Sequence, residues 1–186
     1  MADITTLLNS AVPGSAPANE LFELLYGELK SLARQQSRRH GGADVHTTTL
    51  VHEAYLKFQG VGALRLEDRR HFLAYATRVM RSIIVDHARQ RVAIKRGEGG
   101  VPVTLDTNVS DSRTTDAEVI EVDEALAKLA ELDARLGQIV ELKYFGDMSH
   151  EEIADVLQVS LRTVQRGWEK ARLFLSASLP SRRPLG

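Results

Sequence analysis

The chain has 186 residues, of which 43% are hydrophobic and 26% are charged, and its formal net charge is -1. This length and composition predict one or two small domains with packed cores. Cysteine is absent, which excludes disulfides and thiolate metal sites and fits a reducing compartment. No apolar run approaches a membrane span and no signal-peptide pattern is present, so we expect a cytoplasmic protein without membrane insertion.

The near-neutral net charge hides a separation of charge along the chain. Basic residues dominate over residues 65–96, acidic residues dominate over residues 98–133, and positive charge returns in the last predicted helix. Basic patches of this kind suit contact with nucleic-acid phosphates. In the free protein we expect the two basic faces to pack against each other or against the acidic linker, which would hide their DNA contacts.

Three segments of the N-terminal half carry apolar residues at helical spacing. They cover residues 20–38, 48–59 and 68–95. Together they predict one all-helical domain over residues 20–97. Residues 1–19 are predicted to be a loose lead with a weak helix.

The C-terminal half begins with a predicted flexible linker over residues 98–115, where glycine and proline interrupt the helical period. Val101, Val103 and Leu105 would allow a short extended segment there. Amphipathic helices are then predicted over residues 119–129 and 136–145. They open a second helical domain over residues 116–179, and residues 180–186 form a tail. The predicted fold class is therefore all-α, with two small domains.

The end of this second domain has the pattern of two helices joined by a tight turn. Ser149 and Glu152 form a capping box at the start of the first helix. The turn follows at Gln158, where glycine is the commonest residue because the position favours a positive φ. Ser160 then caps the second helix. A short helix, a brief turn and a second helix rich in long donors is typical of the helix-turn-helix motif.

The outer face of the second helix carries side chains that can hydrogen-bond base edges in the major groove. Its inward stripe is predicted to contain Val164, Ala171 and Leu175, with Trp168 on or beside it. The alternative is a helical hairpin whose polar face is merely solvated, and the caps and the small Ala154 favour DNA binding over it. The predicted DNA-binding residues are Ser160, Arg162, Thr163, Gln165, Arg166, Glu169 and Arg172.

Three stretches of the chain resemble the bacterial sigma factors of the extracytoplasmic-function (ECF) group. ALAKLAELDARLGQIVELKYFGDMSHEEIADVLQVSLRTVQRGWEKAR is similar to sigma region 4, which reads the minus-thirty-five promoter element. HFLAYATRVMRSIIVDHARQRVAIKRG is similar to the part of sigma region 2 that opens and reads the minus-ten element. LVHEAYLKF resembles the helix that docks on the clamp of the largest polymerase subunit, and LVHEAY, VDHAR and KRG together resemble the subgroup linked to Ser/Thr kinases.

The long helix of region 2 supplies the predicted minus-ten contacts. Promoter opening needs aromatic faces for unstacked bases and a basic channel, although aromatic residues at this spacing are more often core residues. By the resemblance, a base-reading loop lies at residues 80–82 between two helical halves, and the arginines and lysine after residue 88 hold duplex phosphates. Asp86 and His87 are expected to cap or pair locally. The predicted minus-ten residues are Phe72, Tyr75, Arg78, Met80, Arg81, Ser82, Arg89, Lys95 and Arg96.

The predicted docking helix departs from the family pattern at its start. Most such factors have acidic residues there, whereas this chain has Thr47, Thr48 and Thr49. Phosphorylation of Thr48, or secondly of Thr49, would restore negative charge at a helix N-terminus. The alternative is that the threonines only cap the helix. The predicted polymerase-binding residues are Thr48, Thr49, Val51, His52, Glu53 and Tyr55.

The resemblance implies partners rather than a catalytic activity. These are core RNA polymerase, through its clamp and flap, promoter DNA and a Ser/Thr protein kinase, with an anti-sigma protein as a further candidate. His52-Glu53 begins the metalloprotease pattern HExxH, but Leu56 stands in place of the second His. We therefore expect no enzyme activity, no metal and no cofactor.

Two other interpretations of the sequence remain open. One is a stand-alone helix-turn-helix regulator with an N-terminal sensing or dimerisation domain, which would bind a palindrome as a dimer. It leaves the basic and aromatic helix before Lys95 unexplained. The other is an interaction protein whose acidic linker titrates a different DNA-binding protein.

Overall fold

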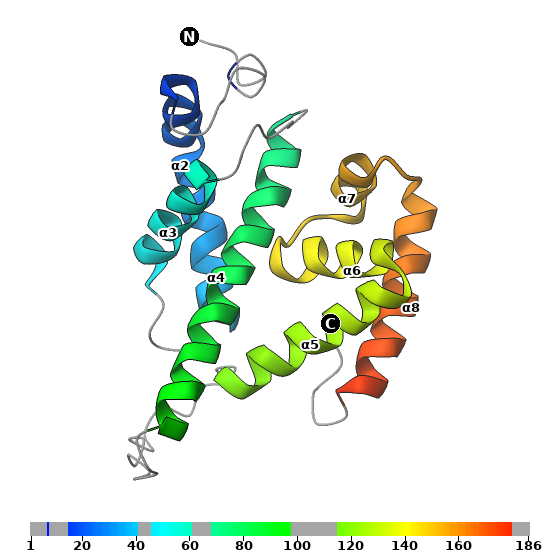
Figure 1. Ribbon diagram of the computed structural model, residues 1–186. Helices are drawn as coiled ribbons and strands as arrows, with labels where there is room; N and C mark the ends of the chain where they lie inside the picture. Colours follow the sequence, from blue (N-terminus) through cyan, green and yellow to red (C-terminus); the bar gives the residue numbers. More distant parts are fainter. Residues whose placement is uncertain (1–6, 8–14, 41–45, 61–67, 98–114, 180–186) are drawn as a thin grey trace.

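The computed structural model describes residues 7, 15–40, 46–60, 68–97 and 115–179 (Figure 1). In these ranges all regular structure is helical, which confirms the all-α fold class. The elements are α2 (Ala16–His40), α3 (Thr47–Gly60), α4 (Arg69–Gly97), α5 (Asp116–Leu132), α6 (Ala134–Val140), the π-helical segment η1 (Glu141–Phe145), α7 (His150–Leu157) and α8 (Leu161–Ser178). None of these helices is long and apolar enough to cross a bilayer.

The N-terminal helices α2, α3 and α4 form one bundle, as the apolar spacing predicts. Leu25 and Leu29 from α2, Leu50 from α3 and Ile84 from α4 are almost completely buried in its core. The helix α2 begins at Ala16, so part of the predicted loose lead is helical. The rest of that lead, apart from Leu7 and Ser15, lies outside the described residues.

The C-terminal helices α5 to α8 form a second bundle around Leu129, Ile139, Leu142 and Ile153. The helix expected over residues 136–145 is present as α6 followed by η1, where the backbone N–H of Gly146 donates to the carbonyl of Glu141. A hydrogen bond from a backbone N–H to the carbonyl five residues earlier is the π-helical pattern. The predicted linker lies outside the described residues except for Thr115, which caps α5. The possible extended segment at Val101, Val103 and Leu105 also lies outside them.

A single residue, Asp133, joins α5 to α6. Its backbone N–H donates to the carbonyl of Leu129, which ends α5. Its carboxylate accepts from the backbone N–H groups of Arg135 and Leu136, which caps α6. A side-chain oxygen before the first helical residue satisfies donors that have no partner within the helix. One residue therefore ends one helix and begins the next.

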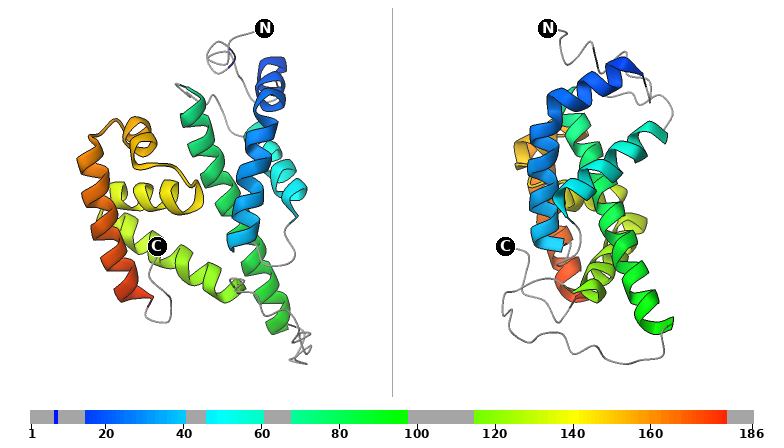
Figure 2. Two further views of the ribbon diagram at one scale, coloured as in Figure 1. Left: turned by 180° about the vertical axis from the view of Figure 1, so that it is seen from behind. Right: turned by 90° about the vertical axis from the view of Figure 1, so that its left-hand side faces the viewer.

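The two bundles pack against each other along α4 (Figures 1 and 2). Ala74 of α4 belongs to the C-terminal core, and Val119 of α5 belongs to the N-terminal core. At the start of α4, Arg70 forms an ion pair with Asp155 of α7. The long helix α4 thus contributes to both bundles and fixes how they lie relative to one another.

Asp68 immediately precedes α4, and its carboxylate accepts from the backbone N–H of His71 at 2.9 Å and contacts the ring Nδ1 at 3.0 Å. Burial alone would raise the pKa of Asp68, but the contacts with His71 lower it below its ordinary value. A carboxylate with a lowered pKa stabilises the fold above its unfolded-state pKa. That stabilisation is lost as the pH falls through the folded-state pKa.

We therefore expect Asp68→Ala to lower the free energy of unfolding by about 1 kcal/mol at neutral pH, the usual effect of losing a helix cap. The loss should be smaller at an acidic pH below about 4, once the pH has also fallen through the lowered folded-state pKa and the wild-type carboxylate is protonated. Urea unfolding at both pH values measures this difference. An equal loss at both would contradict the role of the ionised carboxylate.

Candidate nucleic-acid interface

The helix-turn-helix is formed by α7 and α8 and has the predicted caps. The Ser149 hydroxyl accepts from the backbone N–H of Glu152 at 3.1 Å, and the Ser149 N–H donates to the Glu152 carboxylate at 2.8 Å. Ser160 caps α8 by accepting from the N–H of Thr163 at 3.2 Å. Both observations confirm the capping predicted from the sequence.

The turn between these helices passes through Gln158 in the left-handed region, with φ 53° and ψ 46°. For a residue other than glycine, this conformation costs about 1 kcal/mol or more relative to glycine. The Gln158 amide Nε2 donates to the carbonyl of Asp155 at 2.8 Å, and the backbone N–H of Val159 donates to that of Ala154 at 3.0 Å. These hydrogen bonds hold a glutamine where glycine is commonest.

The inward stripe of α8 is buried as predicted, and this orientation turns the polar face outward. Val164, Trp168, Ala171 and Leu175 all belong to the C-terminal core. Of the predicted DNA-binding residues, Thr163 is half-buried and its hydroxyl lies 2.8 Å from that of Ser160. The exposed ones are Ser160, Arg162, Gln165, Arg166, Glu169 and Arg172.

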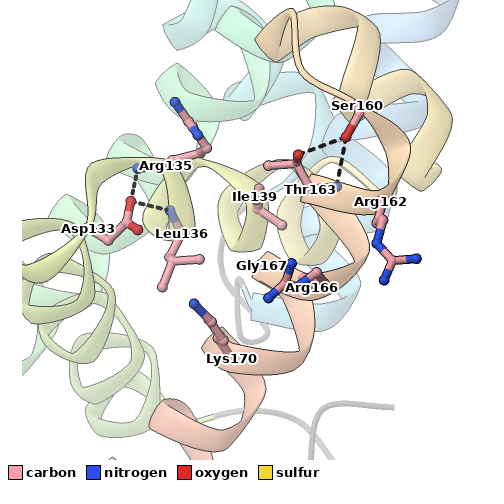
Figure 3. Close-up of a pocket in the computed structure, with 10 residues that line it drawn as sticks. All are labelled: Asp133, Arg135, Leu136, Ile139, Ser160, Arg162, Thr163, Arg166, Gly167 and Lys170. Atoms are coloured by element: carbon pink, nitrogen blue, oxygen red, sulfur yellow. Dashed lines mark hydrogen bonds between the residues drawn. The ribbon is translucent and has the colours of Figure 1, made fainter.

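A hollow of about 330 Å³ lies between the start of α6 and the outer face of α8 (Figure 3). Four cationic side chains line it: Arg135, Arg162, Arg166 and Lys170. Its one carboxylate, Asp133, is turned to the backbone of α6. We call this cationic surface the α6–α8 hollow. Its charge and exposure suit a phosphate group.

Two residues of the α6–α8 hollow, Arg135 and Lys170, are absent from the sequence-based prediction. Lys170 lies four residues after Arg166, so helical spacing places both on one face. Residue spacing could not predict that Arg135 lines the hollow, because its position near α8 depends on how α6 packs on α8. That packing is close at Gly167, where a Cβ atom would stand 2.6 Å from Cδ1 of Ile139.

The basic face of α4 is not free, because acidic residues of the C-terminal domain lie against it. Arg78 Nε and Arg81 Nη1 pair with Glu141 at 3.1 and 2.8 Å. Arg81 and Arg89 both pair with Asp123, at 2.5 and 2.9 Å. The acidic partners of α4 therefore lie on α5 and η1, whereas the acidic linker named in the prediction lies outside the described residues except for Thr115.

The predicted base-reading loop at residues 80–82 is wrong, because α4 is an unbroken helix from Arg69 to Gly97. Met80 is fully buried, and Phe72 is 4% exposed and stacks on Phe58 with ring centroids 5.2 Å apart. Both lie on the apolar stripe that faces α2 and α3. Neither presents a surface to a base in this arrangement.

The remaining predicted residues of α4 occupy three different environments. Tyr75 is half-buried with its ring against Phe58, and burial raises the pKa of its phenol. The Ser82 hydroxyl accepts from Lys57 at 3.0 Å and donates to the carbonyl of Val79. Lys95 is exposed, and the side chain of Arg96 lies outside the described residues.

The predicted docking helix, α3, presents only part of its predicted surface. Thr48, Thr49 and His52 are exposed. Val51 is 2% exposed, and the Tyr55 hydroxyl donates to the Asn19 side chain at 2.6 Å. Leu56, which the sequence-based prediction omitted, is 51% exposed on this helix.

The charged residues of α3 are engaged by α4. Both carboxylate oxygens of Glu53 lie 3.0 Å from Nε2 of His87, and Lys57 pairs with Asp86 at 3.2 Å. This confirms the local pairing expected for Asp86 and His87. The first turn of α3 contains no acidic residue.

Comparison with known proteins shows which family has this architecture. The model of the ECF sigma factor family matches residues 1–181, which include both helical bundles. A search of curated proteins found no match to the chain. The family acts in transcription initiation, with RNA polymerase and promoter DNA as partners. The helix-turn-helix, the second basic helix and this nearly full-length match agree, and the chain belongs to the ECF sigma factor family.

Proposed function

We propose that this chain directs core RNA polymerase to promoters in the cytoplasm, with α8 reading the minus-thirty-five element. The observation that carries this proposal is the exposed cationic face of α8. Arg162, Arg166 and Arg172 form no ion pair among the described residues, so their guanidinium groups are free to pair with guanine edges or phosphates. Arg135 and Lys170 would fix the register of α8 through phosphates of the α6–α8 hollow.

The second part of the proposal assigns the minus-ten element to α4. Its arginines Arg78, Arg81 and Arg89 and the exposed Lys95 lie along one long helix, which suits a DNA backbone. Tyr75 is the aromatic residue of α4 that is only half-buried, so it is the proposed partner for an unstacked base.

The third part concerns α3 and its proposed docking on the polymerase clamp. Thr48 and Thr49 are exposed in the first turn, and that turn has no acidic residue. The carboxylate of Glu53 is directed at His87 of α4, so it is less available to a partner. A phosphate on Thr48 would add nearly two negative charges and interact favourably with the helix dipole. A Ser/Thr kinase would then switch polymerase binding on.

The test is a titration of core RNA polymerase with full-length wild type, Thr48→Glu and Thr48→Ala. We expect the Glu form to bind about tenfold more tightly than the other two, because added charge complements a basic partner. Gln59→Glu is the matched control, since it adds the same charge at the exposed far end of α3. Equal tight binding by all forms would keep the initiation factor and remove the switch. No binding by any form would contradict docking through α3.

A further inference from the structure

The ion pairs that cover the basic face of α4 form one connected set. Arg81 bridges Asp123 and Glu141, while Arg78 shares Glu141 and Arg89 shares Asp123. Two residues after Arg89, Arg91 makes a two-pronged contact with Asp116 at 2.6 to 3.0 Å. We call these contacts the α4 ion-pair network. It joins four arginines of the N-terminal bundle to three carboxylates of the C-terminal bundle.

The centre of the α4 ion-pair network is partly withdrawn from water. The side chains of Arg81, Glu141 and Asp123 are 16%, 14% and 20% exposed. The Arg81 guanidinium also lies over the ring of Phe145, 5.3 Å from its centroid. Charge pairs in such surroundings are less screened by salt than surface pairs. Removing one member of such a pair leaves the charge of the other member poorly compensated.

The carboxylates of the α4 ion-pair network occupy the positions that phosphates of a nucleic acid would need in order to contact the arginines of α4. A guanidinium pairs with a carboxylate and with a phosphate through the same forked geometry. Asp116, Asp123 and Glu141 are therefore spaced along α4 as substitutes for backbone phosphates. The helix α3 lies on the side of α4 away from the C-terminal bundle, so this closure leaves Thr48 and Thr49 accessible (Figure 1).

We propose that Asp116, Asp123 and Glu141 hold the C-terminal bundle closed over the basic face of α4 and so lower the DNA affinity of the free protein. This inference rests on the proposed DNA-binding role of α4. It goes beyond that role because it orders the events: α3 can dock in the closed state, whereas contact of α4 with DNA requires the two bundles to separate. When the bundles separate, the arginines of α4 exchange their carboxylate partners for phosphates of the DNA.

The first test measures opening directly. The chain has no cysteine, so spin labels can be placed at the exposed positions Glu23 on α2 and Ala177 on α8. Double electron–electron resonance then measures the distance between the two labels in the labelled protein and in its Asp123→Asn/Glu141→Gln variant. We expect longer and broader distances in the variant, and a smaller shift in the same direction in the unsubstituted labelled protein at high salt, because the network is only partly screened. Circular dichroism verifies that both remain helical. Unchanged distances in both experiments would overturn the proposal.

The second test measures DNA affinity without polymerase, by fluorescence anisotropy of a short duplex of mixed sequence with a forked end. The control variant is Glu121→Gln/Glu124→Gln, which removes two charges from exposed positions of α5 without touching the network. We expect Asp123→Asn/Glu141→Gln to bind about tenfold more tightly than this control, because Arg78, Arg81 and Arg89 lose their carboxylate partners and become available to phosphates. Equal affinities with unchanged distances would overturn the closure. Equal affinities with increased distances would uphold the closure and contradict the DNA-binding role of α4.

Discussion

Replacing Arg166 with alanine is expected to reduce transcription from a cognate promoter by about tenfold or more, because one bidentate contact to a base discriminates by roughly 1–3 kcal/mol. Arg166 lies exposed on the outer face of α8, one turn after Arg162 and one turn before Lys170. Its neighbour Gly167 packs tightly on Ile139, which fixes the direction of this face. Run-off transcription with core polymerase measures the loss.

Lys170→Ala provides the matched control for Arg166→Ala. An ammonium group on a phosphate contributes affinity without sequence information, so its loss should weaken cognate and scrambled promoters alike and lower the salt dependence of binding. Arg166→Ala should instead reduce the preference for the cognate promoter. If it weakened both DNA sequences equally, Arg166 would be a phosphate contact and not a base contact.

Replacing Gly146 with alanine is expected to lower the free energy of unfolding by about 2 kcal/mol, within the range for strain in a packed site. A Cβ atom at this position would stand 2.6 Å from the carbonyl oxygen of Leu142 and 3.1 Å from Oγ1 of Thr77. The first is backbone, and Thr77 is fully buried with its hydroxyl donating to Leu73 at 2.9 Å. Neither neighbour can move at low energy, so the η1–α4 junction must shift.

The control is Gly27→Ala in the middle of α2. A Cβ atom there has no heavy atom within 4 Å. Alanine favours the helix over glycine, so this change should raise the stability by about 0.5–1 kcal/mol. Urea unfolding of the two variants compares the same chemical change in open and crowded surroundings. A neutral Gly146→Ala variant would show that the junction is loosely packed.

Local signals in the sequence accounted for most of the fold. The apolar spacing located α2, α3 and α4 to within a few residues of their ends, and the Ser149 and Ser160 caps located α7 and α8. These features depend on neighbours within one or two helical turns, which the sequence displays directly. The buried stripe of α8, including Trp168, followed from the same spacing.

Features that depend on contacts between distant residues were not accessible in this way. The pairs of Arg78 and Arg81 with Glu141 join residues 63 and 60 positions apart, so the charge pattern indicated an acidic partner without identifying it. Family resemblance places Met80 in a loop, whereas the position of Met80 on the apolar stripe of α4 indicates burial. Arg135 reaches the α6–α8 hollow only through the packing of α6 on α8.

The junction at Asp133 has a mechanical consequence for promoter spacing. Because this residue ends α5 and begins α6, no loop separates the two helices, and Gly137 of α6 lies close to Ala130 of α5. A rotation of α5 away from α4 would therefore carry α6 and the packed helix α8 with it as a rigid body. The angle between α4 and α8, the two helices proposed to contact promoter DNA, would then be set by the position of α5. The length of DNA between the two promoter elements that the protein accepts would depend on that angle.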